Sequence, residues 1–275
     1  MSIFAIILTA LLEQKRLLNN IRAIFNKYLE SYIEFFTNRT VSSQREIRYI
    51  YLFACLPVIF VLGILGFLLS HHILFYSILK LVLFIFCIHI LTWKEQAKTT
   101  TDNYSYINTY AINFFSVLFW YLVIPASIGA VCYLIIIAIS NSFKEKGLDS
   151  VIYNVTVDKM LFYANVIPYT LLYMFIALAG NFEEVTHFII AQRKHFTKSF
   201  FYLENVLHEI ILIAIGKEKF QLAQEIYNPD DATEANLLQA EKFNPKINSY
   251  IIAILYRTGL FFIGLIAIIS IANIL

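Results

Sequence analysis

Leu161–Gly180 reads LFYANVIPYTLLYMFIALAG, and it runs directly into Asn181-Phe182-Glu183-Glu184. An uncharged run of about 20 residues matches the roughly 30 Å hydrocarbon core of a bilayer, because an α-helix rises about 1.5 Å per residue. Two irregularities mark the segment: Pro168 lies inside it, and an acidic pair follows Gly180. The stretch therefore predicts a transmembrane helix that ends in a polar joint.

The composition of the whole chain also indicates an integral membrane protein. Of its 275 residues, 59% are hydrophobic and only 15% are charged, with a mean hydropathy of +0.68. Soluble domains usually carry about 25% charged residues. The net charge of +2 gives no basic field, so we expect no nucleic-acid partner. Cys55, Cys87 and Cys132 lie in apolar runs and predict neither a disulfide framework nor a metal site.

Several segments are long and apolar enough to cross a bilayer. The predicted spans are residues 49–69, 73–93, 111–139, 161–180 and 250–273. Lys80 interrupts the second, at a cost of about 2.5–3.5 kcal/mol unless it snorkels or faces the bundle. Only His71 and His72 separate the first two spans, which predicts a tight helical hairpin. The fold class we expect is all-α: a polytopic membrane helical bundle of about five spans.

The predicted organisation has four parts. Residues 1–48 repeat apolar side chains at three- and four-residue steps, which predicts an amphipathic N-terminal helical segment. This helix lies either in the headgroup region or against the protein's own bundle. Residues 49–180 form the transmembrane bundle, 181–249 a cytoplasmic helical region, and 250–275 a C-terminal transmembrane helix.

The 181–249 region is too periodic for a simple loop. One apolar face runs from Val185 to Ile211, with helix continuing toward Gly216. Two further helices are expected between residues 217 and 244, separated by Asn228-Pro229-Asp230-Asp231. The region is too small for an independent catalytic domain and is expected to form a small cytoplasmic helical layer.

The distribution of basic residues predicts the orientation, because cytoplasmic loops are enriched in lysine and arginine. With five alternating spans, one face of the membrane receives Lys15, Arg16, Arg22, Lys27, Arg39, Arg45, Arg48, Lys94, Lys98, Arg193, Lys194, Lys198, Lys217, Lys219, Lys242 and Lys246. The opposite face receives Lys144, Lys146 and Lys159. The N-terminus is therefore expected in the cytoplasm and the C-terminus in the periplasm.

Known catalytic and nucleotide-binding motifs are missing from the sequence. There is no GxxxxGK[ST], GxGxxG, GxSxG or HExxH pattern. Glu184-x-x-His187 has the spacing of a di-iron motif, but such a site needs a second copy and two further carboxylates, and solvated helix-face charges are the better interpretation. No predicted span contains Asp or Glu, which disfavours a proton- or cation-coupled transporter.

Four short stretches occur in an order that points to a family. They are ALLEQKR (Ala10–Arg16), VLFWYLVIPASIGAVCY (Val117–Tyr133), NVIP (Asn165–Pro168) and GNFEE (Gly180–Glu184). Pro125 and Pro168 would each kink a span and free a carbonyl one turn earlier, which protein or water must satisfy at membrane depth. Together the stretches resemble the AmpE-like branch of the CobD/CbiB superfamily of bacterial inner-membrane proteins.

The resemblance implies two alternative functions. AmpE-like proteins are associated with signalling in β-lactamase induction and cell-wall sensing, whereas CobD/CbiB proteins are ATP-using, amide-forming adenosylcobinamide-phosphate synthases of cobalamin biosynthesis. The chain departs from the enzyme pattern: the Asp-Pro…His-Pro-Val type opening is missing, Asn113 stands near an expected acid, and Tyr169-Thr170 replaces the Arg that commonly follows the proline. These departures favour the non-enzymatic branch. A small transporter subunit is a third, weaker alternative.

From this resemblance we expect no catalytic residue, no metal and no cofactor, with ATP only if the enzyme alternative holds. The residues expected to carry functional weight are Glu13, Asn113, Trp120, Pro125, Gly129, Asn165, Pro168, Gly180, Asn181, Glu183 and Glu184. The expected partners are the lipid bilayer and a membrane or cytoplasmic protein bound through residues 181–249. Acids after Gly180 are disfavoured at a helix C-terminus, so they are expected to begin a new helix, with Gly180-Asn181 as a joint.

Overall fold

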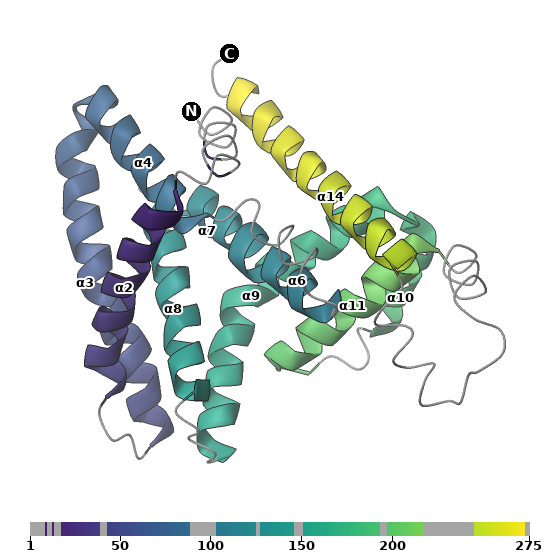
Figure 1. Cartoon of the computed structure of the whole chain (residues 1–275), viewed down its shortest axis with the longest axis horizontal. Coiled ribbons are helices and arrows are strands. Elements are labelled where there is room, and N and C mark those ends of the chain that lie inside the picture. The colour runs from purple at the N-terminus through teal and green to yellow at the C-terminus, as the bar shows by residue number, and fades with distance from the viewer. Residues whose placement is uncertain are drawn as a thin grey trace. The chain divides into compact units, whose positions relative to one another are not determined.

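The computed structural model describes residues 9, 13, 18–38, 43–88, 103–124, 127–145, 151–192, 197–216 and 245–272 (Figure 1). Every element in this part of the chain is a helix, which confirms the predicted all-α class. The elements are α2 (Asn19–Thr37), α3 (Gln44–Ser70), α4 (Ile73–Cys87), α6 (Asn103–Thr109), the π-helix η1 (Tyr110–Ser116), α7 (Val117–Val123), α8 (Ile128–Glu145), α9 (Val151–Ala179), α10 (Phe182–Gln192), α11 (Phe200–Ile215) and α14 (Pro245–Ala272).

The chain forms two compact units. The first comprises Met1–Ile90 and Ser116–Ile167, and the second comprises Leu91–Phe115 and Pro168–Leu275. Because the sequence passes between them three times, each unit is assembled from segments that are distant in sequence.

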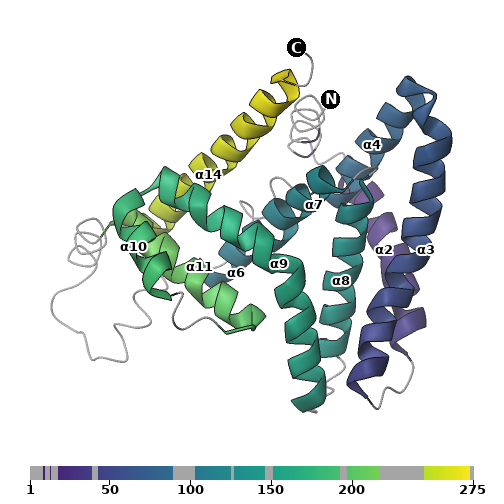
Figure 2. The same ribbon diagram turned by 180° about the vertical axis from the view of Figure 1, so that it is seen from behind.

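In the first unit α8 is the central helix, with α2, α3, α4 and α7 against it (Figures 1 and 2). Hydroxyl groups join several of these helices. Tyr51 and Ser140 oxygens lie 2.8 Å apart, and Thr37 Oγ1 lies 3.1 Å from Ser142 Oγ. The Tyr32 hydroxyl also donates to the Ala54 carbonyl at 2.7 Å. The amphipathic helix α2 therefore packs against the protein's own helices.

The interval 111–139, expected to be a single kinked span, is instead two helical segments. The chain is helical from α6 through η1 to Val123, and α8 begins only at Ile128. Ile124 has an extended backbone, and Ser127 has a positive φ of 61°. The helix is therefore interrupted after Val123, and α8 packs on α7. The prediction of one span over 111–139 was wrong because a short apolar break between two helices leaves the hydropathy pattern unchanged.

The tight hairpin predicted at His71-His72 is present between α3 and α4, which are packed together. The second expected span, 73–93, is shorter in the structure. Helix α4 ends at Cys87, and its 15 residues rise only about 22 Å. Lys80 is half-buried in this helix, with its ammonium 4.2 Å from the centre of the Tyr76 ring. The cation–π contact compensates part of the lysine's desolvation.

In the second unit α11 is the central helix and packs against α6, α10 and α14. Leu207, Ile210 and Ile211 on α11 are fully buried. The apolar face expected to be continuous from Val185 is carried by two helices, since α10 ends at Gln192 and α11 begins at Phe200. Helix α11 ends before Gly216, whose φ of +90° favours glycine. The helices expected between residues 217 and 244 lie outside the described residues.

Five of the described helical stretches are long and apolar enough to cross a bilayer. They are Gln44–Ser70, Ser105–Val123, Ile128–Glu145, Val155–Ala179 and Ile247–Ile268. On α3 the side chains of Phe60 and Phe67 are 66% and 72% exposed, respectively. Large apolar groups exposed along such helices are suited to contact lipid, as expected for a membrane protein.

Candidate functional site

The motif residues Trp120, Gly129 and Asn165 come together in the first unit, around a buried amide. Asn165 lies on α9 with 0% of its surface exposed, and its Oδ1 accepts hydrogen bonds from two hydroxyls. The donors are Tyr133 on α8, at 2.7 Å, and Ser116 at the end of η1, at 3.1 Å. Asn165 Nδ2 donates to the Leu161 carbonyl at 2.9 Å. We call Ser116, Tyr133 and Asn165 the amide cluster.

The carbonyl freed by Pro168 also has a partner in this region. A proline inside a helix has no N–H to donate to the carbonyl four residues earlier, which is that of Ala164 in α9. The indole Nε1 of Trp120 donates to this oxygen at 2.9 Å. Of the two expected partners for the freed carbonyl, protein or water, the structure shows protein, and Trp120 is the residue that donates.

Gly129 is required by the close approach of α8 to the end of α7. A Cβ atom at this position would overlap the carbonyl oxygen of Trp120 and lie 2.8 Å from the Cβ of Ile124. The backbone carbonyl of Trp120 thus lies directly against Gly129, while the Trp120 indole bonds to α9. Pro125, the other residue of this motif, lies outside the described residues.

Asn113, which stands near an acid of the enzyme pattern, lies in the middle of the π-helix η1. Its side chain is half-buried. π-helical turns are rare and often occur at functional sites, because an extra residue per turn re-aims the side chains that follow. Here the next polar residue is Ser116, which ends η1 and donates to Asn165.

Glu13 forms a buried ion pair with Arg22 of α2, with both side chains only 6% exposed. The same guanidinium donates to the end of α4, through Nε and Nη2 to the Ile85 carbonyl at 3.1 and 3.0 Å. Nη2 also donates to the Ile88 carbonyl at 2.6 Å. Arg22 therefore caps the last turn of α4, whose carbonyls have no partner within the helix.

Gly180 and Asn181 form a tightly packed joint in the second unit. A Cβ at Gly180 would lie 2.6 Å from both the Cβ and the carbonyl oxygen of Ala214 on α11. The backbone N–H of Asn181 donates to that oxygen at 3.2 Å. The side-chain Oδ1 of Asn181 accepts from the backbone N–H of Glu184 at 3.4 Å. Asn181 thus caps α10, and the exposed Glu183 and Glu184 lie in its first turn, where the helix dipole favours acids.

His208, on α11, is a buried histidine of the second unit. Its Nε2 lies 3.2 Å from Asn108 Oδ1, and burial lowers the pKa of His208 to about 4. The imidazole is therefore neutral near pH 7 and donates from Nε2 to the amide oxygen. Among the described residues, no group of three or more His, Cys, Asp and Glu side chains could hold a metal ion.

The candidate residues thus fall into three places that fix helix ends or breaks: the amide cluster with Trp120, Gly129 and Pro168, the Glu13–Arg22 pair, and the Gly180-Asn181 joint. Sequence reasoning did not single out Ser116 or Arg22. Arg22 could have been found by its spacing, since it follows the buried Leu18 by four residues and so shares its face. Comparisons with protein-family models, with curated proteins and with solved structures found no match to this chain.

Proposed function

We propose that the chain is a non-enzymatic accessory or signalling protein of the bacterial inner membrane, of the AmpE-like type, acting in cell-wall sensing and β-lactamase induction. The observation that supports the non-enzymatic part of this proposal is the burial of the amide cluster. Asn165, Tyr133 and Ser116 are at most 2% exposed, and their polar atoms bond to one another. Groups engaged in this way hold helices together and are not presented to a substrate.

The surface of the second unit supports a protein-binding role. Helix α10 begins with the exposed Phe182, Glu183 and Glu184, and Ile190 is 59% exposed near its other end. An exposed helix that carries both acids and large apolar groups is suited to bind a membrane-associated or cytoplasmic partner. This helix belongs to the 181–249 region, through which a membrane or cytoplasmic protein partner was expected.

Deleting the gene in its host is expected to change β-lactamase induction, or the response to cell-wall precursors, while leaving cobalamin synthesis intact. Induction is measured as β-lactamase activity after β-lactam exposure, and cobalamin synthesis as growth under conditions that require it. Complementation with the wild-type chain controls for effects on neighbouring genes. Unchanged induction with loss of cobalamin synthesis would overturn the proposal in favour of the synthase branch.

For the same proposal we expect the N-terminus in the cytoplasm and the C-terminus in the periplasm. An odd number of crossings, such as the five candidate spans, leaves the termini on opposite sides. Alkaline phosphatase fused after Leu275 should then be active, and green fluorescent protein fused there should be dark, whereas a fusion before Met1 should fluoresce. Fluorescence at the C-terminus would indicate an even number of crossings, as if the short helix α4 also crossed.

A further inference from the structure

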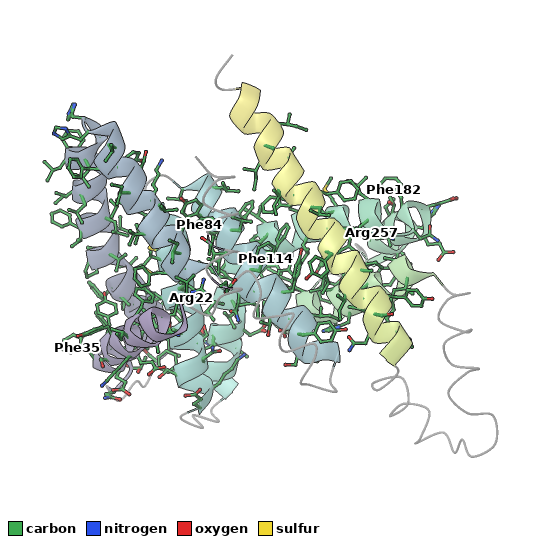
Figure 3. The ribbon with its side chains drawn as sticks, turned by 45° about the horizontal axis from the view of Figure 1, so that its top comes forward. Arg22, Phe35, Phe84, Phe114, Phe182 and Arg257 are labelled. Carbon is green, nitrogen blue, oxygen red and sulfur yellow. The ribbon has the colours of Figure 1, made fainter. Side chains whose placement is uncertain are left out.

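Arg257 is an exposed cation within the candidate span Ile247–Ile268 of α14. Figure 3 labels it on α14, with Phe182 at the start of α10. Within the described part of the chain, the guanidinium has no hydrogen-bond or ion-pair partner. An unpaired arginine inside a spanning segment is costly, and such residues usually pair with a ligand, a lipid or another protein group.

A hollow of about 380 Å³ lies beside Arg257. It is lined by Gly180, which follows α9, by Gly216, which follows α11, and by Ala253 of α14. Small residues at these positions leave the space open, and the volume falls within the roughly 300–1,000 Å³ of small-molecule sites. Asn181 and Tyr250 add polar groups to its wall.

The candidate span Ile247–Ile268 includes Arg257, but the uncharged run of residues 258–275 that follows is long enough to cross a bilayer by itself, and this crossing places Arg257 and the hollow at headgroup depth. After Arg257 the sequence carries no charged residue through Leu275. Leu260 and Ile268, in this uncharged stretch of α14, are each 67% exposed, as expected for side chains that face lipid. Tyr250 and Tyr256, before and beside Arg257, are of the residue type enriched at the membrane–water interface.

We propose that the hollow binds the phosphate group of an anionic membrane lipid, with Arg257 as its cationic partner. The guanidinium presents several N–H donors in a planar fork that matches phosphate oxygens, and such charge-assisted bonds are strong at the edge of the hydrocarbon core. Basic residues near an anionic membrane surface attract its lipids. The site does not depend on the signalling role proposed above, since it requires only α9, α11 and α14.

Lipid retention by the full chain in a neutral detergent tests the site, with native mass spectrometry as the readout. Phosphatidylglycerol should be retained better than phosphatidylcholine, and Arg257→Gln should weaken its retention about fivefold. Ala253→Leu, which fills the hollow but keeps the guanidinium, should weaken retention as well. Arg48→Gln, at an exposed arginine of α3, is the matched control and should bind as the wild type.

A second arm separates the lipid from a free anion. Inorganic phosphate is added in place of lipid, and thermal unfolding is followed in the wild type and in Arg257→Gln. Stabilisation of the wild type alone, without lipid preference, would support a phosphate site whose ligand is soluble. If both Arg257→Gln and Ala253→Leu retained phosphatidylglycerol as well as the wild type does, the proposal would be overturned. If Arg257→Gln does not fold, Ala253→Leu decides alone.

Discussion

Replacing Asn165 by leucine is expected to lower the free energy of unfolding by about 3 kcal/mol, because two buried hydroxyls lose their acceptor at about 1–3 kcal/mol each. Those hydroxyls belong to Tyr133 and Ser116, at 2.7 and 3.1 Å from the Asn165 oxygen. No water is available inside a bilayer to replace the lost bonds. The free energy of unfolding is measured by titrating the purified chain from neutral micelles into a denaturing detergent.

Asn26→Leu is the matched control for this variant. Asn26 is exposed on α2, so the same substitution there should change stability by less than about 0.5 kcal/mol. Both variants replace an asparagine side chain by leucine, but Asn165 is buried and hydrogen-bonded whereas Asn26 is exposed. Equal stability losses for both would mean that Asn165 contributes only as an ordinary helix residue.

Replacing Arg22 by methionine is expected to cost about 3–5 kcal/mol, the usual cost of removing one partner from a buried ion pair. The change leaves the Glu13 carboxylate without its cation and leaves the Ile85 and Ile88 carbonyls at the end of α4 without their donor. Arg22→Lys should recover only part of this loss, because an ammonium cannot reproduce the planar fork that bonds three groups. Stability is measured by the same detergent titration.

The double variant Arg22→Met with Glu13→Met separates two effects of losing Arg22: the loss of the ion pair with Glu13 and the loss of the cap on α4. It should be more stable than Arg22→Met alone, since no uncompensated carboxylate remains, yet less stable than the wild type because α4 stays uncapped. Arg45→Met, at an exposed arginine in the first turn of α3, should have little effect. If Arg22→Met behaved like Arg45→Met, the buried cap would be disproved.

The sequence was sufficient to predict most spanning helices, because long uncharged runs have few alternatives. Residues 161–179 lie within α9, which ends one residue before the predicted end at 180, and residues 250–273 correspond closely to α14. The break between α7 and α8 could not be predicted in the same way. The sequence from Ile124 to Ser127 is nearly as apolar as the helices beside it, so one kinked helix and two separate helices give the same hydropathy profile.

Charged residues were harder to assign than apolar ones. Arg22 was counted with the cytoplasmic cations, although it is only 5% exposed and bonded to Glu13 and α4. Tyr28, on the same helix, belongs to the pattern of apolar and aromatic side chains at three- and four-residue steps but is 73% exposed. Periodicity locates a helix face but does not say which face packs, since lipid and a neighbouring helix both accept apolar side chains.

The proline and the acidic pair in the opening stretch were assigned correctly from local physical rules. Pro168 had to free the Ala164 carbonyl, although nothing in the sequence identified Trp120 as its partner. Glu183 and Glu184 were expected to begin a helix, and α10 begins there. Local rules thus predicted that the Ala164 carbonyl would need a donor and that a helix would begin after Gly180. They did not identify the donor, Trp120, which comes from a distant part of the chain.

A double-mutant cycle between Asn165 and Tyr133 tests most directly whether the motif residues act together as a structural cluster. Detergent titration of Asn165→Leu, Tyr133→Phe and the double variant yields the coupling energy between the two side chains. Because the hydroxyl of Tyr133 donates to Asn165 at 2.7 Å, we predict a coupling of about 1 kcal/mol or more. Additive effects, with no coupling beyond error, would contradict the cluster.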